Sequence, residues 1–357
     1  MSGRSEVRVA LLVGIALLVG MALLVGAVVA PVVAPGVASA AHGRVRAANS
    51  TATGGPQPAV PATGAYLGIW LDPGITTTPT AIETTANLLR SVQQFPAFDA
   101  TLGRPLGFVH LYQRGNLNKF APVTNGMLRA VAATGAIPLI DWPCALPDSS
   151  IIQGAMDTSI TKFAQQLARY SGPVFLRWSW EMNLKNLPIN VACQGTLGAT
   201  GYIQAFQHIR AIFAQYATNV AFVWCPSAAP AAATPHSYYP GNSTGATTVV
   251  NWIGFDGYNR TVAPSTSIGQ WQTFYSKFSG FGKPMMVAET GAPASSPNTT
   301  QASFLAAVEQ ALPSMPEVKA VGYYDSKTKA NNWTLNAAGR TQYIALASDP
   351  YFSAVSP

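Results

Sequence analysis

Short runs of apolar residues recur along the chain from residue 65 onward, and longer stretches with helical spacing separate them. This alternation predicts strand and helix units on a parallel sheet. Strands buried on both faces are almost continuously hydrophobic, as residues 137–140 and 285–288 are. The eight runs are Tyr66–Leu71, Gly107–Leu111, Ile137–Trp142, Val174–Trp180, Val220–Cys225, Trp252–Tyr258, Pro284–Glu289 and Val318–Asp325.

Two of the intervening stretches show the apolar spacing of amphipathic helices, Thr161–Tyr170 and Tyr202–Tyr216. Eight strands with helices between them predict a single α/β domain with the architecture of a (β/α)8 TIM barrel. A doubly wound sheet alternates in the same way and stays open as an alternative. Because no Gly-rich fingerprint follows the first run, a dinucleotide-binding sheet is disfavoured.

The beginning of the chain has the pattern of a targeting segment. Arg4 and Arg8 precede an apolar run over residues 9–30, and Ala38-Ser39-Ala40 fits a cleavage site. We therefore expect residues 1–40 to be a signal peptide, or a signal-anchor if they are not cleaved, since the run is long enough to span a bilayer. Residues 41–63 are rich in small and polar residues and predict a flexible linker that buries nothing. The barrel domain then extends over residues 64–357.

The charge pattern excludes several classes of protein. The formal net charge is +7, from 21 basic and 14 acidic residues, and the basic residues are scattered singly. This scatter argues against a nucleic-acid-binding groove. The four histidines form no paired ligand motif, so we expect no metal site and no cofactor.

Export would permit disulfide bonds, and the chain has three cysteines. Cys144 and Cys193 each follow a strand-like run, in loops that we expect to be neighbours, whereas Cys225 lies inside a run. We predict a Cys144–Cys193 bridge and a buried free thiol at Cys225. Three single-bridge pairings are open on the sequence alone.

Carboxylates concentrate at the ends of the apolar runs. Removing residues 1–40 leaves 13 acidic residues (14 minus Glu6), and six of them lie at such ends: Asp72, Asp141, Glu181, Asp256, Glu289 and Asp325. In a barrel these ends form the face that carries the active site. An aspartate at a strand end also orders turns and caps helices, which is the favoured interpretation for Asp72, Asp141 and Asp325.

Glu181 and Glu289 differ from these aspartates because glutamate is a poor turn former and each ends a strong strand. Period-two alternation places Phe175, Arg177, Ser179 and Glu181 on one face. If the two runs are the fourth and seventh strands, the glutamates face each other across the barrel mouth. Two carboxyl groups about 5–5.5 Å apart suit a retaining glycosidase. Their mutual repulsion would also raise the pKa of one of them.

Aromatic residues follow the same distribution and suit the flat faces of sugar rings. Trp178 alternates out of phase with Glu181 and should pack behind its strand. Trp142, Trp224 and Trp333 are better candidates for sugar-binding platforms, although each is also explained as a core filler. His110 either contacts substrate or makes hydrogen bonds within the barrel.

Four segments resemble consecutive motifs of glycoside hydrolase family 26, the family of many β-mannanases. They are residues 177–183 (RWSWEMN), 222–227 (FVWCPS), 252–259 (WIGFDGYN) and 283–291 (KPMMVAETG), and their order and approximate spacing also match. The resemblance extends from about Tyr66 to Tyr324 and is specific in the second half.

The resemblance implies a barrel acting with retention, in which Glu181 is the acid/base and Glu289 the nucleophile. Tyr258 would hold an oxygen of the nucleophile and Arg177 would order the barrel interior. Further substrate contacts are expected at Trp180, Asn183, Asp256 and Tyr324. The family has histidine where this chain has Trp180, and its aromatic residue on the eighth strand corresponds here to Tyr323 or Tyr324 rather than to tryptophan. These departures put specificity for mannan in doubt, and β-glucan, xylan or an envelope polysaccharide are alternatives.

The sequence therefore predicts a secreted, monomeric endo-glycoside hydrolase acting on a β-linked polysaccharide, with membrane attachment only if the leader is retained. Two alternatives are a non-catalytic carbohydrate-binding barrel and a membrane-anchored envelope protein.

Overall fold

The computed structural model describes residues 54–72, 85–113, 123–144, 146–185, 197–242, 244–245, 247–261, 263–294, 300–328 and 331–355. The predicted leader and Cys193 lie outside these ranges, so the signal peptide or signal-anchor and the Cys144–Cys193 bridge stay predictions.

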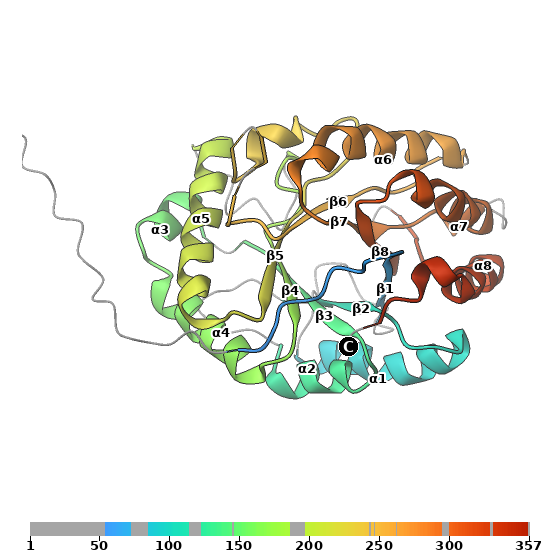
Figure 1. Ribbon diagram of the computed structural model, residues 1–357, viewed down its shortest axis with the longest axis horizontal. Helices are drawn as coiled ribbons and strands as arrows, with labels where there is room; N and C mark the ends of the chain where they lie inside the picture. The colour runs from blue at the N-terminus through green and yellow to red at the C-terminus, as the bar shows by residue number, and fades with distance from the viewer. Residues whose placement is uncertain are drawn as a thin grey trace, which may run out of the picture. The chain divides into compact units, whose positions relative to one another are not determined.

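Eight parallel strands form a closed barrel in the order in which they occur along the chain, and β1 pairs with β8 to close it (Figure 1). The (β/α)8 TIM barrel is therefore confirmed, and the doubly wound alternative is excluded. The strands are β1 (Tyr66–Leu71), β2 (Phe108–Tyr112), β3 (Ile137–Trp142), β4 (Val174–Trp178), β5 (Val220–Trp224), β6 (Trp252–Asp256), β7 (Met285–Thr290) and β8 (Val318–Asp325).

Helices surround the barrel and cover the outer face of its strands (Figure 1). They are α1 (Thr85–Leu102), α2 (Asn125–Ala132), α3 (Asp148–Ile152), α4 (Asp157–Tyr170), α5 (Gly198–Tyr216), α6 (Pro264–Phe278), α7 (Thr300–Ala311) and α8 (Ala337–Ser348), with 3-10 turns η1 (Pro235–Tyr238), η2 (Ser279–Phe281), η3 (Leu312–Ser314) and η4 (Pro350–Phe352). None of the helices in the described ranges is long and apolar enough to cross a membrane.

The lower part of the barrel interior is filled by aromatic side chains. Phe175 packs edge-on against Trp252 and Phe108, with ring centroids 5.0 and 6.3 Å away. The Phe108 ring in turn occupies the space beside Gly68, where a Cβ atom would come within 2.4 Å of it. Because alternate residues of a strand share a face, His110 and Arg177 point inward one layer above Phe108 and Phe175. The apolar layer thus closes the barrel beneath a charged layer.

Residues 54–63 cross the end of the barrel at which the strands begin, where Figure 1 shows them as the blue segment running from α4 toward β1. The amide of Gly55 donates to the Ser171 carbonyl after α4, and Gln57 donates to the carbonyl of Val220 at the start of β5. The hydroxyl of Tyr66 donates to Ala59. The prediction that residues 41–63 bury nothing is wrong for this part, because its backbone polar groups find partners on the barrel.

Candidate active site

The end of β7 places Glu289 at the barrel mouth. The register of β7 shifts against both neighbouring strands near this residue, and Asp256 at the end of β6 pairs with it. Such bulges re-aim a side chain at the end of a strand. The carboxylate of Glu289 accepts hydrogen bonds from the hydroxyls of Tyr112 (to Oε1) and Tyr258 (to Oε2), each at 2.6 Å. The predicted contact between Tyr258 and Glu289 is therefore present.

Arg177 connects the carboxylates inside the barrel. Its guanidinium donates to Asp141 Oδ1, to both oxygens of Asp256 and to Glu289 Oε1, and it is fully buried. Its predicted role in ordering the barrel interior is borne out by these contacts. Asp141, which the sequence favoured as a turn former, belongs instead to this buried network.

His110 supports the same network from below. Its Nδ1 lies 2.7 Å from Asp141 Oδ2, and its Nε2 lies 2.8 Å from the carbonyl of Ala288, the residue before Glu289. Its ring stacks on that of Tyr112 with centroids 5.5 Å apart. Of the two roles open for His110, hydrogen bonding within the barrel is the one found.

Glu289 is held in its ionised form. Burial alone would raise the pKa of Glu289, but the charge of Arg177, the electrostatic contribution of His110 and the hydrogen bonds from two tyrosine hydroxyls outweigh burial. The pKa therefore lies below its ordinary value. A carboxylate that accepts several hydrogen bonds and faces a cation is expected to behave in this way.

The end of β4 departs from regular strand geometry. Ser179 and Glu181 adopt positive φ angles of 47° and 52°, which non-glycine residues rarely do. The expected alternation therefore stops at Trp178, and Trp180 as well as Glu181 turns toward the barrel mouth. Trp180 lies over Arg177, whose guanidinium carbon is 4.9 Å from its ring centroid. Trp178 stacks on Tyr202 of α5, behind the strand as predicted.

Glu181 has the opposite protonation tendency to Glu289. Burial, followed by repulsion from Glu289, raises the pKa of Glu181 to about 7. Arg177, a hydrogen bond with Ser227 and the charge of Arg260 oppose this rise. The site therefore combines one carboxyl group that keeps its proton up to about neutral pH with an ionised carboxylate, the pairing required for acid/base and nucleophilic roles.

Three of the predicted substrate contacts do not lie where substrate could reach them. Trp142 packs between its strand and the aromatic rings of α4 and α5, with the centroid of Phe163 5.2 Å away. Trp224 packs against Phe278 and donates from its indole nitrogen to a backbone carbonyl. Both indoles are 1% exposed or less. They point outward from the barrel into the helical layer, so the prediction of sugar platforms at these two positions is wrong.

Asn183 is the third such residue. Its amide nitrogen donates to the carbonyls of Ser227 and Ala233, and its Oδ1 accepts from the amide of Ser227. The side chain is thus occupied with backbone groups after β5. It positions Ser227, the hydrogen-bond partner of Glu181, rather than a sugar.

Tyr324 and Trp333 do lie beside the carboxyl pair. Tyr324 packs edge-on against Tyr112 and Tyr258, with centroids 5.8 and 6.3 Å away. Trp333 lies 4.9 Å from the Tyr258 ring. Tyr323 is buried and donates to the carbonyl of Trp333, so Tyr324 is the aromatic residue of β8 at the mouth.

Reasoning from the sequence missed three residues of the site, Tyr112, Ser227 and Arg260. Tyr112 lies one residue beyond the run that predicted β2, two residues after His110. Because alternate residues of a strand share a face, the sequence could have placed Tyr112 on the same side as His110. Ser227 and Arg260 lie in loops after β5 and β6, where no periodicity indicates the direction of a side chain.

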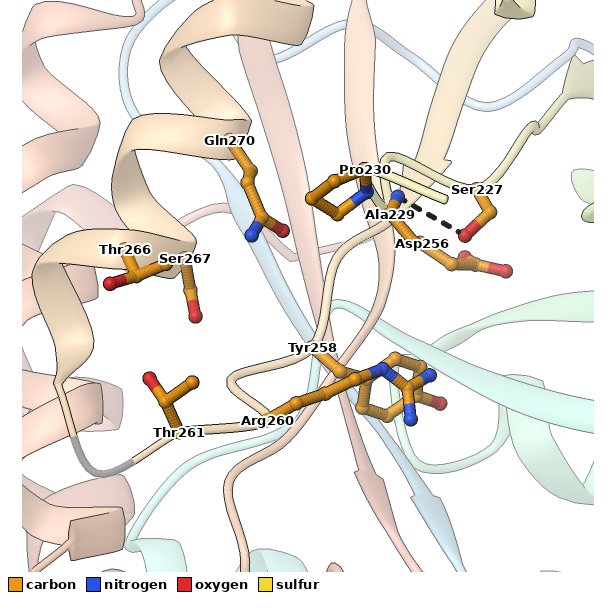
Figure 2. A pocket seen from close by; sticks show the side chains of 10 residues that line it. All are labelled: Ser227, Ala229, Pro230, Asp256, Tyr258, Arg260, Thr261, Thr266, Ser267 and Gln270. Atoms are coloured by element: carbon orange, nitrogen blue, oxygen red, sulfur yellow. Dashed lines mark hydrogen bonds between the residues drawn. The ribbon is translucent and has the colours of Figure 1, made fainter. Parts of the chain in front are cut away.

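A small open pocket adjoins the carboxyl pair, with an empty volume of about 380 Å³ that includes open solvent. Figure 2 shows its lining, with Arg260 extended beside Tyr258 and Gln270 across from them. The lining comprises Ser227, Ala229, Pro230, Asp256, Tyr258, Arg260, Thr261, Thr266, Ser267 and Gln270. Most of the polar groups here are hydroxyls and an amide, which suits a hydroxylated ligand.

The two cysteines in the described ranges, Cys144 and Cys225, are both buried. Cys225 is a free, buried thiol, as predicted, and its Sγ lies 3.2 Å from Asp256 Oδ1. Cys144 is buried in the loop after β3. Within the described ranges no group of three or more His, Cys, Asp or Glu side chains is placed to hold a metal ion.

The molecule is thus a (β/α)8 barrel with two carboxyl groups at the carboxyl ends of β4 and β7, one with a raised and one with a lowered pKa. Its structure is similar to that of a modular family 26 endo-β-1,4-mannanase from Cellulomonas fimi, with a TM-score of 0.57 and 16% identity over 82% of this chain and 72% of that one. A family 26 β-mannanase from Bacteroides ovatus matches with a TM-score of 0.56 and 14% identity over 83% of this chain and 92% of that one.

A fungal β-1,4-galactanase matches with a TM-score of 0.53 and 11% identity, over 79% of this chain and 99% of that one. No family model and no curated protein matches the sequence. At these identities the similarity establishes the fold, which resembles that of the family 26 mannanases.

Proposed function

We propose that the protein is a glycoside hydrolase that cleaves a β-linked polysaccharide with retention of configuration. The observation that carries the proposal is the opposite protonation tendency of Glu181 and Glu289 at one end of the barrel. The fold shared with family 26 mannanases and a galactanase supports it, because retaining glycosidases use two carboxyl groups in these two states.

Each carboxyl group has one role in the reaction. The ionised Glu289 attacks the anomeric carbon while Glu181 protonates the leaving glycosidic oxygen, which gives a glycosyl-enzyme and a shortened chain. Glu181 then removes a proton from water, and that water releases the sugar from Glu289. Tyr112, Tyr258 and Arg177 hold Glu289 in place throughout.

The remaining features of the proposal come from the sequence. The enzyme would be secreted, or tethered if the leader is retained, and would act as a monomer. It would cut within a β-mannan-like or β-glucan-like chain that lies across the barrel mouth. Trp180 and Tyr324 are the aromatic residues that face that chain.

Isosteric substitutions test the assignment. Glu181→Gln and Glu289→Gln each remove one acidic function without changing side-chain volume, and each should lower kcat/KM by at least about 10²-fold on a panel of β-linked polysaccharides. Glu317→Gln is the matched control, because Glu317 is exposed just before β8, at the opposite end of the barrel. Activity retained in either active-site variant, with folding unchanged, would refute the proposal.

The stereochemical part needs its own measurement. With an activated aryl β-glycoside, azide should restore turnover of Glu181→Ala and Glu289→Ala. Glu181→Ala should give a β-glycosyl azide, since azide replaces water in the second reaction step. Glu289→Ala should give an α-glycosyl azide, since azide replaces the carboxylate nucleophile. An α-configured product released first by the unmodified enzyme, detected by proton NMR, would exclude retention. Polysaccharide binding without new reducing ends would instead indicate the non-catalytic barrel.

A further inference from the structure

Arg260 is a cation at the active site that the reaction chemistry does not use. It lies in the loop after β6, its side chain is exposed, and it lines the pocket beside the carboxyl pair (Figure 2). In the described part of the chain its guanidinium makes no ion pair and no hydrogen bond.

The position of this guanidinium is nevertheless defined. Its central carbon lies 5.5 Å from the ring centroid of Tyr258 and 5.8 Å from that of Trp333, and the two rings pack on each other. Stacking on aromatic faces holds a guanidinium while leaving its N–H groups free to bind a ligand. The charge of Arg260 also acts on Glu181, so the group is close to the reacting centre.

The other groups of the pocket do not satisfy Arg260. The carboxylate of Asp256 is 1% exposed, and both its oxygens already accept from Arg177. Thr266 contributes a hydroxyl and Gln270 an amide. The hydroxyls of Ser227 and Ser267 also line the pocket, and they already hydrogen-bond to Glu181 and Asn259. A ligand entering the pocket therefore meets hydroxyl and amide groups suited to sugar hydroxyls, and one unpaired guanidinium. A planar guanidinium pairs best with a carboxylate, through two parallel hydrogen bonds.

We propose that this pocket recognises a uronic acid residue, a sugar ring with a carboxylate at C6, within the β-linked substrate. The proposal rests on the proposed function because it names the substrate class of that same site. Arg260 pairs with the uronate carboxylate, and the hydroxyl side chains around it bind the ring hydroxyls. The face of Trp333 that the sequence predicted as a sugar platform is thereby used to hold the arginine.

A matched pair of substrates isolates the carboxylate. Oligomers of β-1,4-linked mannuronic acid, and the same oligomers after chemical reduction of their carboxyl groups to the neutral mannan, differ only at C6. The full-chain enzyme should show a higher kcat/KM on the uronate oligomers. Arg260→Gln should reduce that preference by about tenfold or more, the loss expected for a hydrogen bond between charged groups.

Arg169→Gln is the control variant. Arg169 is exposed in the last turn of α4, at the end of the barrel remote from the site. The substitution therefore removes one positive charge without changing the pocket. It should keep the uronate preference of the unmodified enzyme. Arg260→Lys keeps the positive charge but cannot form two parallel hydrogen bonds to one carboxylate. Its uronate preference should lie between those of the unmodified enzyme and Arg260→Gln.

The outcomes separate this inference from the proposed function. Equal cleavage of the two substrates, or a uronate preference that survives in Arg260→Gln, would overturn the inference and leave the hydrolase assignment intact. If neither substrate is cleaved, the affinities of both oligomers, measured by calorimetric titration, decide. Tighter binding of the uronate form that is lost in Arg260→Gln supports the inference, and equal or undetectable binding of both forms overturns it.

Discussion

At the scale of single residues, the site depends on how hydrogen-bond donors are divided between two glutamates. Glu289 receives donors from Arg177, Tyr112 and Tyr258, whereas Ser227 is the side chain that hydrogen-bonds to Glu181. Donors stabilise the charged form of a carboxyl group, and burial without enough of them stabilises the neutral form. The two similar side chains are thus differentiated by their neighbours.

Tyr112→Phe removes one donor from Glu289 and tests this division. The pKa of Glu289 should rise toward its ordinary value, so the acidic limb of the kcat/KM profile should move to higher pH. Loss of a hydrogen bond to a charged group should lower kcat/KM by about ten- to hundredfold. Tyr216→Phe, at the end of α5 remote from the site, should change neither. An acidic limb that stays in place would show that Tyr112 does not stabilise the carboxylate.

Arg260→Gln should shift the alkaline limb of the pH profile of kcat/KM. The positive charge of Arg260 lowers the pKa of Glu181, against burial and the charge of Glu289, which raise it to about 7. Removing that charge raises the pKa, so the acid stays protonated to higher pH. On a neutral substrate the alkaline limb of the kcat/KM profile should therefore move to higher pH in Arg260→Gln. It should stay in place in Arg169→Gln. A shift of the alkaline limb to lower pH would contradict the electrostatic role of Arg260.

At the scale of secondary-structure elements, the sequence predicted the strands well because each is buried on both faces. Three runs, Tyr66–Leu71, Ile137–Trp142 and Val318–Asp325, match β1, β3 and β8 residue for residue. The same continuity of hydrophobic residues does not say which side chains face inward. This is why Trp142 and Trp224 were assigned to the site although they face the helices.

Positions governed by neighbours rather than by periodicity were not predictable. The left-handed backbone at Ser179 and Glu181 depends on bonds to other strands, since Ser179 donates to the carbonyl of Trp142 and Glu181 to that of Cys225. A low-complexity composition likewise hid the docking of residues 54–63, because the partners Ser171 and Val220 lie more than 100 residues away along the chain. Glu181 and Glu289 could be placed at the barrel mouth from the sequence because both lie at strand ends.

The segment over residues 54–63 gives a prediction at this scale. Gln57 donates to Val220 and accepts from Asn251, which itself accepts from the amide of Phe222. Gln57→Ala should lower the free energy of unfolding by about 1–2 kcal/mol, because it leaves buried backbone and amide groups without partners. That corresponds to a Tm lower by roughly 2–6 °C. Gln310→Ala, at an exposed position of α7, is the control, and the Tm of each variant is measured by calorimetry. Equal Tm values for Gln57→Ala and Gln310→Ala would contradict the docking of residues 54–63.

At the scale of the whole molecule, several buried acids favour acidic conditions. Burial raises the pKa of Asp148 to about 7 and those of Asp99 and Asp325 to about 6, and Glu181 follows the same direction. Between pH 4 and 7 the folded state then binds more protons than the unfolded state, so stability falls as the pH rises. The pKa values of Asp256 and Glu309 are also raised, and only that of Glu289 is shown to be lowered among the described acids.

We therefore expect the Tm to decrease from pH 5 to pH 8. Asp148→Asn removes the ionisation of a buried carboxyl oxygen that has no hydrogen-bond partner in the described structure. The variant should be more stable than the unmodified protein at pH 8, by a few degrees, and the difference should shrink toward pH 4. Thermal denaturation in a series of buffers measures both. A Tm that rises with pH in the unmodified protein would contradict the expectation.

The docking of residues 54–63 also fixes the end of the barrel at which this part of the chain arrives. It enters beside the starts of β4 and β5, whereas Glu181 and Glu289 lie at the far rim. The chain therefore joins the barrel at the end opposite the rim that carries Glu181 and Glu289. A long glycan that lies across that rim would not meet residues 54–63.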